Sequence, residues 1–405
     1  MSGGAYLAPM TLRPLGLAVA FALCAIGAGS TSAATTPSYG PLIEQWDGTV
    51  WTQVPIPFPG SLSTVVAVSA NDVWALGNED IGQAEALHWD GSAWQQVAIP
   101  SPKDADEVNL YRTAAVAAND LWVVGDWAGP RTGGYRTLIE HWDGTAWHIV
   151  RSPNPTDNDA LFGVTALSRD DAWAVGSYAG ARLGHRFRLQ RTLVLHWNGK
   201  AWQWVSSSPN PPRENLATSS HHDGLAGVAA VSARNVWAVG NYFRRATNGR
   251  HSFQTLVLHW NGKHWKHVAS PNPGKLGHPN RLYDVAATSA TEIWAVGSYR
   301  NGSGPELPLI ERRVHAWRAV AAPGPMAIAD ELQLTSVAPL SADDAWAAGE
   351  YLDDADLEPK TLVEHWNGTE WTVVPTPNPY SADGLYGIAA VSTNDVWAVG
   401  SWGTD

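Results

Sequence analysis

The chain has 405 residues, 23 tryptophans against six phenylalanines, a single cysteine and a formal net charge of −12. A surface this acidic argues against nucleic acid as a partner, because nucleic-acid binding requires a basic stripe. A lone cysteine excludes a disulfide framework, so core packing and sheet closure must hold the fold together.

The N-terminal segment has the pattern of a secretory signal. Arg13 is the only charge among the first 34 residues, the run 15–28 is apolar or small, and the small residues at 30–34 offer a cleavage site. The apolar run is too short to span a bilayer comfortably. We therefore expect a signal peptide over 1–34, which includes Cys24, and a single exported domain over 35–405. An uncleaved anchor is the alternative.

Two motifs then alternate along the chain. The first is a hairpin with a Trp on either side of an Asx-Gly turn, as in the Trp-Asp-Gly-Thr-Ala-Trp of 142–147. The second is Val-Trp-Ala-Val-Gly or a close variant, as at 236–240. Each recurs seven times at intervals of about 50 residues, and one hairpin, at 312–317, is degenerate. The spacing predicts a repeat architecture.

Each repeat resolves into four short strands. In the third repeat we expect strands over 161–167, 172–176, 192–197 and 201–205. Asn198-Gly199 is a strong hairpin signal because both central positions of its turn need positive φ. No segment between the strands has a helical period, so the sequence predicts an all-β chain.

The two ends of the repeat array are half units. The array begins with third and fourth strands at about 42–56 and finishes with first and second strands at 385–402. Joining the halves would pair strand edges that an open array leaves bare. The sequence therefore predicts a seven-bladed β-propeller with four antiparallel strands per blade and a 2+2 closure between the N-terminal and C-terminal hairpins.

This pattern resembles the bacterial seven-bladed propellers grouped with kelch, galactose-oxidase-like and BNR-type repeats. The resemblance covers the chain after the signal and rests on the repeat, not on an active-site motif. The kelch Gly-Gly doublet is replaced by a single glycine, as at Gly176 and Gly240. Consequently no functional residue of these families is carried over.

The functional face is predicted from loop lengths. The turns between strands one and two and between strands three and four are tight, whereas the other connections are long and variable and leave the disc on one face. Loops on a rigid scaffold are where binding resides. We call this the variable-loop face; its longest predicted loops are 179–191, 206–224, 243–254 and 270–281.

A ring of aromatic residues is the candidate binding site on that face. The pattern Gly-x-aromatic follows the second strand in every repeat except the first, which has Glu79. The six rim aromatics are Trp127, Tyr178, Tyr242, Tyr299, Tyr351 and Trp402. Their rings suit stacking on sugars or on a peptide; the alternative is that each packs against its neighbouring blade. A related position entering the first strand holds Tyr111, Phe162, Tyr283 and Tyr386.

Charged loop residues offer further candidates. Cations gather at Arg182, His185, Arg186, Arg188, Arg191, Arg244, Arg245, Arg250 and His251, and indicate either an anionic ligand or solvated loop surface. Asp353, Asp354, Asp356 and Glu358 have the opposite sign, but their spacing matches no EF-hand. Five histidines precede hairpin tryptophans, at 88, 141, 196, 259 and 365. Each belongs to a different blade, too far from the others to share an ion, so we expect no metal site and one structural contact per blade.

The sequence favours an exported, non-enzymatic binding or scaffold propeller that recognises a glycan or a protein. We expect a monomer without a cofactor, outside the cell or at its surface, with no stable membrane insertion after signal cleavage. No catalytic motif was found. The alternatives are an extracellular glycosidase or lyase with acids on the same face, for which Glu79, Asp126 and Glu350 are candidates in type, and a purely structural envelope protein.

Overall fold

The structure, a computed structural model, describes residues 39–79, 83–183, 187–205, 224–245, 251–274, 277–324, 331–353 and 355–404. The chain divides into Met1–Thr36 and Pro37–Asp405. The expected signal peptide and Cys24 lie outside the described residues. Within the described ranges, no helix has the length and hydropathy to cross a membrane.

In this part of the chain, 28 strands form seven antiparallel sheets of four strands each, which we call blades 1 to 7. Blades 1 and 2 are β3 (Ser61–Ser69), β4 (Asp72–Asn78), β5 (Ala84–Trp89) and β6 (Trp94–Gln96), then β7 (Glu107–Ala117), β8 (Asp120–Ala128), β9 (Arg136–Trp142) and β10 (Trp147–Ile149). Blades 3 and 4 are β11 (Asp159–Ser168), β12 (Asp171–Leu183), β13 (Phe187–Trp197) and β14 (Trp202–Trp204), then β15 (Gly224–Ser232), β16 (Asn235–Arg245), β17 (His251–Trp260) and β18 (Trp265–Val268). Blades 5 and 6 are β19 (Asn280–Ala287), β20 (Ile293–Arg300), β21 (Glu306–Arg313) and β22 (Trp317–Val320), then β23 (Leu332–Pro339), β24 (Ala345–Leu352), β25 (Pro359–Trp366) and β26 (Trp371–Val373). Blade 7 combines β27 (Ala382–Ser392) and β28 (Asp395–Gly403) with β1 (Tyr39–Trp46) and β2 (Trp51–Gln53).

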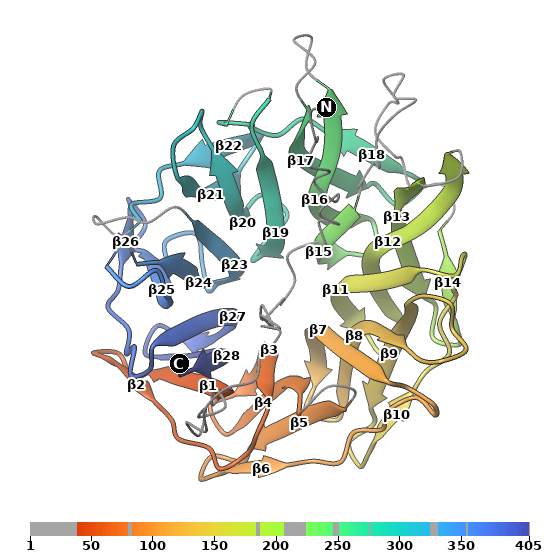
Figure 1. Ribbon diagram of the computed structural model, residues 1–405, viewed down its shortest axis with the longest axis horizontal. Helices are drawn as coiled ribbons and strands as arrows, with labels where there is room; N and C mark the ends of the chain where they lie inside the picture. The colour runs from red at the N-terminus through yellow and green to blue at the C-terminus, as the bar shows by residue number, and fades with distance from the viewer. Residues whose placement is uncertain are drawn as a thin grey trace, which may run out of the picture. The chain divides into compact units, whose positions relative to one another are not determined.

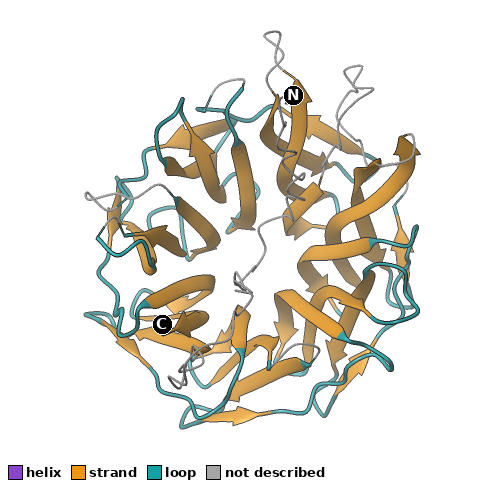
Figure 2. Ribbon diagram, viewed as in Figure 1, coloured by secondary structure: helices purple, strands orange, loops and turns teal. Residues whose placement is uncertain are grey.

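The blades stand side by side around one axis, with the first strand of each blade innermost (Figures 1 and 2). The ring closes in blade 7, where β1 pairs antiparallel with β28 from Tyr39 opposite Gly403 to Trp46 opposite Val396. The predicted seven-bladed propeller and its closure between the first and last hairpins are confirmed. The closure removes the two strand edges that an open array would expose.

Every innermost strand carries a bulge at the same place. In blade 2, Leu110 faces Gly125 and Arg112 faces Val124, so Tyr111 is the extra, unpaired residue. The bulge brings the first strand against the second: a Cβ on Gly125 would lie 1.8 Å from the Asn109 carbonyl oxygen. This close approach explains the single glycine that ends each Val-Trp-Ala-Val-Gly motif.

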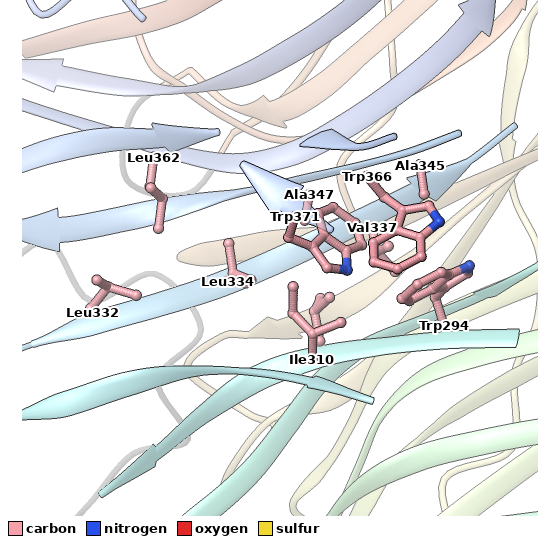
Figure 3. Close-up of a cluster of buried hydrophobic side chains, with 11 residues drawn as sticks. Trp294, Ile310, Leu332, Leu334, Val337, Ala345, Ala347, Leu362, Trp366 and Trp371 are labelled. Carbon is pink, nitrogen blue, oxygen red and sulfur yellow. The ribbon is translucent and has the colours of Figure 1, made fainter. Parts of the chain in front are cut away.

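Tryptophans fill the seams between blades. Trp294 of blade 5 lies 5.3 Å, ring centre to ring centre, from both Trp366 and Trp371 of the blade 6 hairpin (Figure 3). Each such aromatic pair adds about 0.5–1.5 kcal/mol to the burial of its surface. The same triad joins Trp346 to Trp46/Trp51, Trp397 to Trp89/Trp94, Trp74 to Trp142/Trp147, Trp122 to Trp197/Trp202 and Trp173 to Trp260/Trp265.

The degenerate hairpin preserves this contact with a different residue. The spacing of the other hairpins places the missing first Trp at Arg312, but this hairpin is one residue shorter, so Arg313 lies opposite Trp317 and takes that position. Its guanidinium lies 4.5 Å above the ring of Trp237, and Trp317 completes the triad. The triads, including the one completed by Arg313, thus account for all the tryptophans except Trp127, Trp204 and Trp402.

The five histidines make the structural contacts expected of them. The His141 ring packs at a tilt against Trp122, and its Nε2 lies 2.7 Å from Oδ1 of Asp120 at the start of the second strand. Equivalent contacts join His88 to Asp72, His196 to Asp171, His259 to Asn235 and His365 to Asp344. Blade 5 substitutes an Arg312–Glu292 ion pair and blade 7 a Gln45–Asp395 hydrogen bond. The contact ties strands two and three of each blade.

Buried glutamates occupy one position of the third strand in four blades. Glu44, Glu140, Glu311 and Glu364 have no exposed surface, where blades 1, 3 and 4 have Leu87, Leu195 and Leu258. Burial raises the pKa of Glu140 to about 9; burial and the nearby charge of Asp383 raise the pKa of Glu44 to about 8. Neither carboxyl has a hydrogen-bond partner among the described residues. Burial therefore favours the protonated, uncharged form of both groups.

Candidate functional site

The rim aromatics lie one to a seam. All six are half-buried, and each packs against the hydrophobic core that its blade shares with the preceding blade. Tyr178 also meets Trp204 edge to face at 5.6 Å, and Trp402 stacks on Tyr380 at 4.0 Å. The structure therefore distributes these residues over six seams.

Trp127, one of the six rim aromatics, borders a cavity. A pocket of about 420 Å³ opens beside it at the variable-loop end of blade 2. We call this the blade-2 pocket; its lining residues are Lys103, Asp104, Trp127, Gly129, Arg131, Thr132, Arg136 and Asn154. Its volume lies within the range of small-molecule sites.

Local sequence shapes the pocket from three connections. Gly129-Pro130-Arg131-Thr132 forms a turn in which the Thr132 N–H donates to the Gly129 carbonyl, with Pro at the position that favours its fixed φ. A Cβ on Gly129 would lie 2.2 Å from the Asp104 carbonyl oxygen, so the loop before β7 rests directly on this glycine. Asp104 itself has a φ of 67°, a left-handed conformation that Asp tolerates better than most residues. From the third connection, Asn154 Oδ1 accepts from the N–H of Thr137 at 2.8 Å.

Arg136 is the pocket residue that pairs with Trp127 across two strands. It stands directly opposite Trp127 in the β8–β9 register, so the two side chains share one face of the sheet. Its guanidinium donates to the Thr156 carbonyl at 2.6 Å and to the Thr132 carbonyl at 3.3 Å. The pocket thus sets an aromatic face beside an oriented cation.

A polar network lies between this pocket and the axis. Asn109 donates to both Glu107 and Asp126, at 3.1 and 3.0 Å. The Tyr111 hydroxyl donates to Asp126 at 3.3 Å, and the Tyr135 hydroxyl donates to Glu107 at 2.9 Å. Burial, followed by the charge of Asp126, raises the pKa of Tyr111 well above its usual value. The network holds the inner end of blade 2 in one arrangement.

The four aromatics at the entry of the first strand are bulge residues. Tyr111 and Phe162 of adjacent blades lie 5.2 Å apart, and the hydroxyls of Tyr283 and Tyr386 bond to Ser298 and Ser401 of their own second strands. The bulge points each ring back over the neighbouring strand. The hydroxyls of the three tyrosines are consequently engaged within the fold.

An arginine crosses the axis of the propeller. Residues from all seven innermost strands line a cavity of about 270 Å³, and Arg112 reaches across it from blade 2. Its guanidinium donates to the Tyr386 carbonyl at 3.1 Å and to the Thr335 carbonyl, and lies 3.6 Å from Asp284 of blade 5. Asp284 also accepts from Ser336 and from the N–H of Val337.

The three acids considered as catalytic candidates lie in three different blades. Asp126 is 4% exposed and belongs to the blade 2 network. Glu350 of blade 6 accepts from Gln333 at 2.8 Å, and burial raises its pKa. Glu79 of blade 1 is half-buried. The structure shows no hydrogen bond or short contact that joins these three described carboxylates.

The charged loops differ from expectation in their structure. Much of 179–191 and 243–254 is strand, because β12 and β13 extend to pair Leu183 with Phe187, and β16 and β17 extend to pair Arg245 with His251. His185, Arg186, Arg250 and the loop 206–223 lie outside the described residues. The predicted cation group is therefore described only in part, at residues such as Arg191 and Arg244.

The acidic loop of blade 6 is folded on itself. Asp353 and Asp356 accept from the backbone N–H groups of Ala355 and Glu358, and Asp356 pairs with Lys360 at 3.2 Å. Asp354 lies outside the described residues. Among those that are described, no group of three His, Cys, Asp or Glu side chains is placed to hold a metal ion.

Sequence reasoning missed Arg112, Asp284 and the cations of the blade-2 pocket. A readable signal existed for the pocket, because Arg136 opens the third strand and Trp127 ends the second, which makes them cross-strand neighbours in a hairpin. The same pairing gives Tyr178 opposite Arg191 and Tyr351 opposite Lys360. No local signal pairs Arg112 with Asp284, which meet only across the closed ring.

These features define a seven-bladed β-propeller. No family model matches the chain, and no curated protein is similar enough to match. Among solved structures, YCF48 from Cyanidioschyzon merolae has 15% identity and a TM-score of 0.51 over 88% of this chain and 97% of that one. An ulvan lyase bound to -[GlcA(1-4)Rha3S]- has 11% identity and a TM-score of 0.53 over 84% and 89%. The fucose-specific lectin from Aleuria aurantia has 12% identity and a TM-score of 0.42 over 79% and 99%. At such identities the first two likenesses show the fold alone.

Proposed function

We propose that this protein is an exported, non-enzymatic propeller that binds a glycan on its variable-loop face, with the blade-2 pocket as its primary site. The single observation that carries the proposal is the half-buried indole of Trp127 bordering a cavity of about 420 Å³ whose other lining residues are charged or polar, apart from Gly129. Sugars present apolar C–H faces and a rim of hydroxyls, so they are held by an aromatic face combined with hydrogen-bonding side chains. The N-terminal pattern of a secretory signal agrees with a ligand met outside the cell.

The test is a glycan array followed by calorimetry on the glycans retained. Replacing Trp127 by Ala is expected to weaken binding about tenfold, the value of one aromatic contact. Trp204→Ala is the matched control, because Trp204 is an exposed indole on the outer strand of blade 3 and does not line the pocket. An array without any retained glycan, or equal affinities for the Trp127→Ala variant and the wild type, would refute the proposal.

An enzyme that acts on carbohydrates is the second candidate. The observation in its favour is Glu350, whose carboxyl has a pKa raised by burial, as a general acid requires. The retained glycans are therefore incubated with the protein, and their reducing ends and unsaturated products are measured. Turnover that is lost in Glu350→Gln would favour the enzyme; retention without turnover supports binding.

A further inference from the structure

The blade-2 pocket has an excess of positive charge in an acidic protein. Lys103, Arg131 and Arg136 line it against one carboxylate, that of Asp104, whereas the whole chain has a net charge of −12. A local excess of this kind attracts anions to a site that the rest of the surface repels.

Arg136 is oriented but not neutralised. Two carbonyl oxygens fix its guanidinium, and no described carboxylate lies within ion-pair distance of it. Asp159 senses the charge of Arg136, but its carboxylate accepts from the hydroxyl and N–H of Thr156. A guanidinium has five N–H donors, so donors remain for an anion. Arginine binds carboxylates and sulfates through two parallel hydrogen bonds.

The two other cations stand at the outer wall of the pocket. Lys103 has no ion pair with any described residue and is exposed. Arg131 pairs with Asp104 at 2.5 Å, but its side chain is 82% exposed. Exposed ion pairs of this kind contribute little, so an incoming anion competes readily for the arginine.

We infer that the glycan held by the blade-2 pocket is acidic: a sugar ring stacked on Trp127 carries a carboxylate or a sulfate that is bound by Arg136 and Lys103. This inference rests on the proposed glycan-binding function and names the class of sugar. The cross-strand pairing of Trp127 with Arg136 is the geometric basis, because a substituent at the edge of a stacked ring falls beside the oriented guanidinium.

The experiment compares matched pairs of oligosaccharides on one array. Each uronate oligosaccharide is printed beside its methyl ester, and each sulfated oligosaccharide beside its desulfated form. The charged member of a pair is expected to bind at least tenfold more tightly, with the preference falling as salt rises because ionic attraction is screened. Preference among uronates or among sulfated sugars identifies which anion the pocket takes.

A charge reversal separates the pocket from the overall charge of the protein. Lys103→Glu is expected to weaken binding of the charged sugar about tenfold at low salt, a larger loss than for its neutral partner. Lys200→Glu changes the net charge equally but lies in the hairpin turn of blade 3, on the opposite face, and is expected to have little effect. Both positions are exposed, so neither variant threatens the fold.

The outcomes distinguish the two proposals. Two results together would overturn the acidic-sugar inference: equal affinities for the neutral and the charged sugar of a pair, and equal effects of Lys103→Glu and Lys200→Glu on the affinity for the charged sugar. The glycan-binding proposal would remain intact. An array with no retained sugar of either kind would remove the proposed function, and this inference with it.

Discussion

Blades 2 and 7 carry a tryptophan at the same position of the second strand, but its surroundings differ between the two blades. Trp127 and Trp402 occupy equivalent positions at the end of the second strand, and both pack on a seam. In blade 7 the cross-strand partner is Gly40, and a Cβ there would lie 2.7 Å from the Trp402 indole. Tyr380 stacks on the other side of that indole at an interplanar angle of 15°. In blade 2 the partner is Arg136, and the indole borders an open pocket.

The residue opposite the aromatic differs between the two blades. In blade 7, Gly40 of β1 leaves room for the Trp402 indole, which lies at the pairing of β1 with β28. In blade 2, Arg136 of β9 stands opposite the Trp127 indole. A repeated residue therefore marks a repeated position, whose surroundings differ from blade to blade.

The largest expected effect comes from breaking the link between the two blades. Arg112 of blade 2 bonds to the Tyr386 carbonyl of blade 7 and pairs with Asp284. Arg112→Ala leaves a largely buried carboxylate without its cation, so we expect a loss of about 2–4 kcal/mol in the free energy of unfolding, measured in urea. Adding Asp284→Ala should recover part of that loss. A change below about 1 kcal/mol in the free energy of unfolding of Arg112→Ala would show that the contacts of Arg112 across the axis do not contribute to stability.

Removing the Trp402 indole from blade 7 should have the next largest effect on stability. Trp402→Ala is expected to reduce the free energy of unfolding by about 2–3 kcal/mol, less than a fully buried indole because Trp402 is half-buried. Glycan affinity should not change. Trp127→Ala is the matched comparison and should show the reverse: weaker binding and a smaller loss of stability. Equal losses of stability in Trp402→Ala and Trp127→Ala would contradict the expectation that the Trp402 indole contributes more to the fold than the Trp127 indole.

The buried glutamates of the two blades predict a smaller, pH-dependent effect. The unfolded chain has an ordinary glutamate pKa near 4.5, and burial raises the folded pKa of Glu140 to about 9. The folded state therefore keeps a proton that the unfolded state releases, and stability falls as pH rises from about 4.5 towards 9. Glu140→Leu, which copies Leu195 of blade 3, should raise the melting temperature more at pH 8 than at pH 4.5.

Blade 7 provides the control for this measurement. The pKa of Glu44 is raised less, to about 8, so Glu44→Leu should give a smaller difference between the two pH values. Each substitution is expected to stabilise by about 1–2 kcal/mol at pH 8, because it removes a buried group without hydrogen-bond partners. The same increase at both pH values would mean that these carboxyls do not titrate on unfolding.

The fold was predictable because its signals are local and repeated. The Asx-Gly hairpins, the Val-Trp-Ala-Val-Gly strands and the half units at the two ends specify strands, repeat number and closure. The bulge at Tyr111 leaves no such signal, because it arises where the first strand crowds a glycine of the second. The Arg112–Asp284 contact joins residues that are far apart in sequence and needs the closed ring to form.

The candidate site was predictable only as a set of positions. The Gly-x-aromatic pattern found Trp127 and its five equivalents, but could not rank them. Their ranking depends on cross-strand partners and on loops that rest against each other, such as Asp104 on Gly129. Of the pocket's cations, Lys103 comes from the β6–β7 connection, and Arg131 and Arg136 come from the β8–β9 connection and the start of β9. No single stretch of sequence therefore contains all three.

The indole triads of the seams have a spectroscopic consequence. Rings held at fixed angles about 5 Å apart couple electronically, so light absorbed in one seam is shared among its three chromophores. Circular dichroism in the aromatic region should then report the angle between neighbouring blades, and loosening of a single seam would change the spectrum before any strand is lost. The tryptophans of the seams therefore serve as intrinsic spectroscopic probes of how the blades pack together.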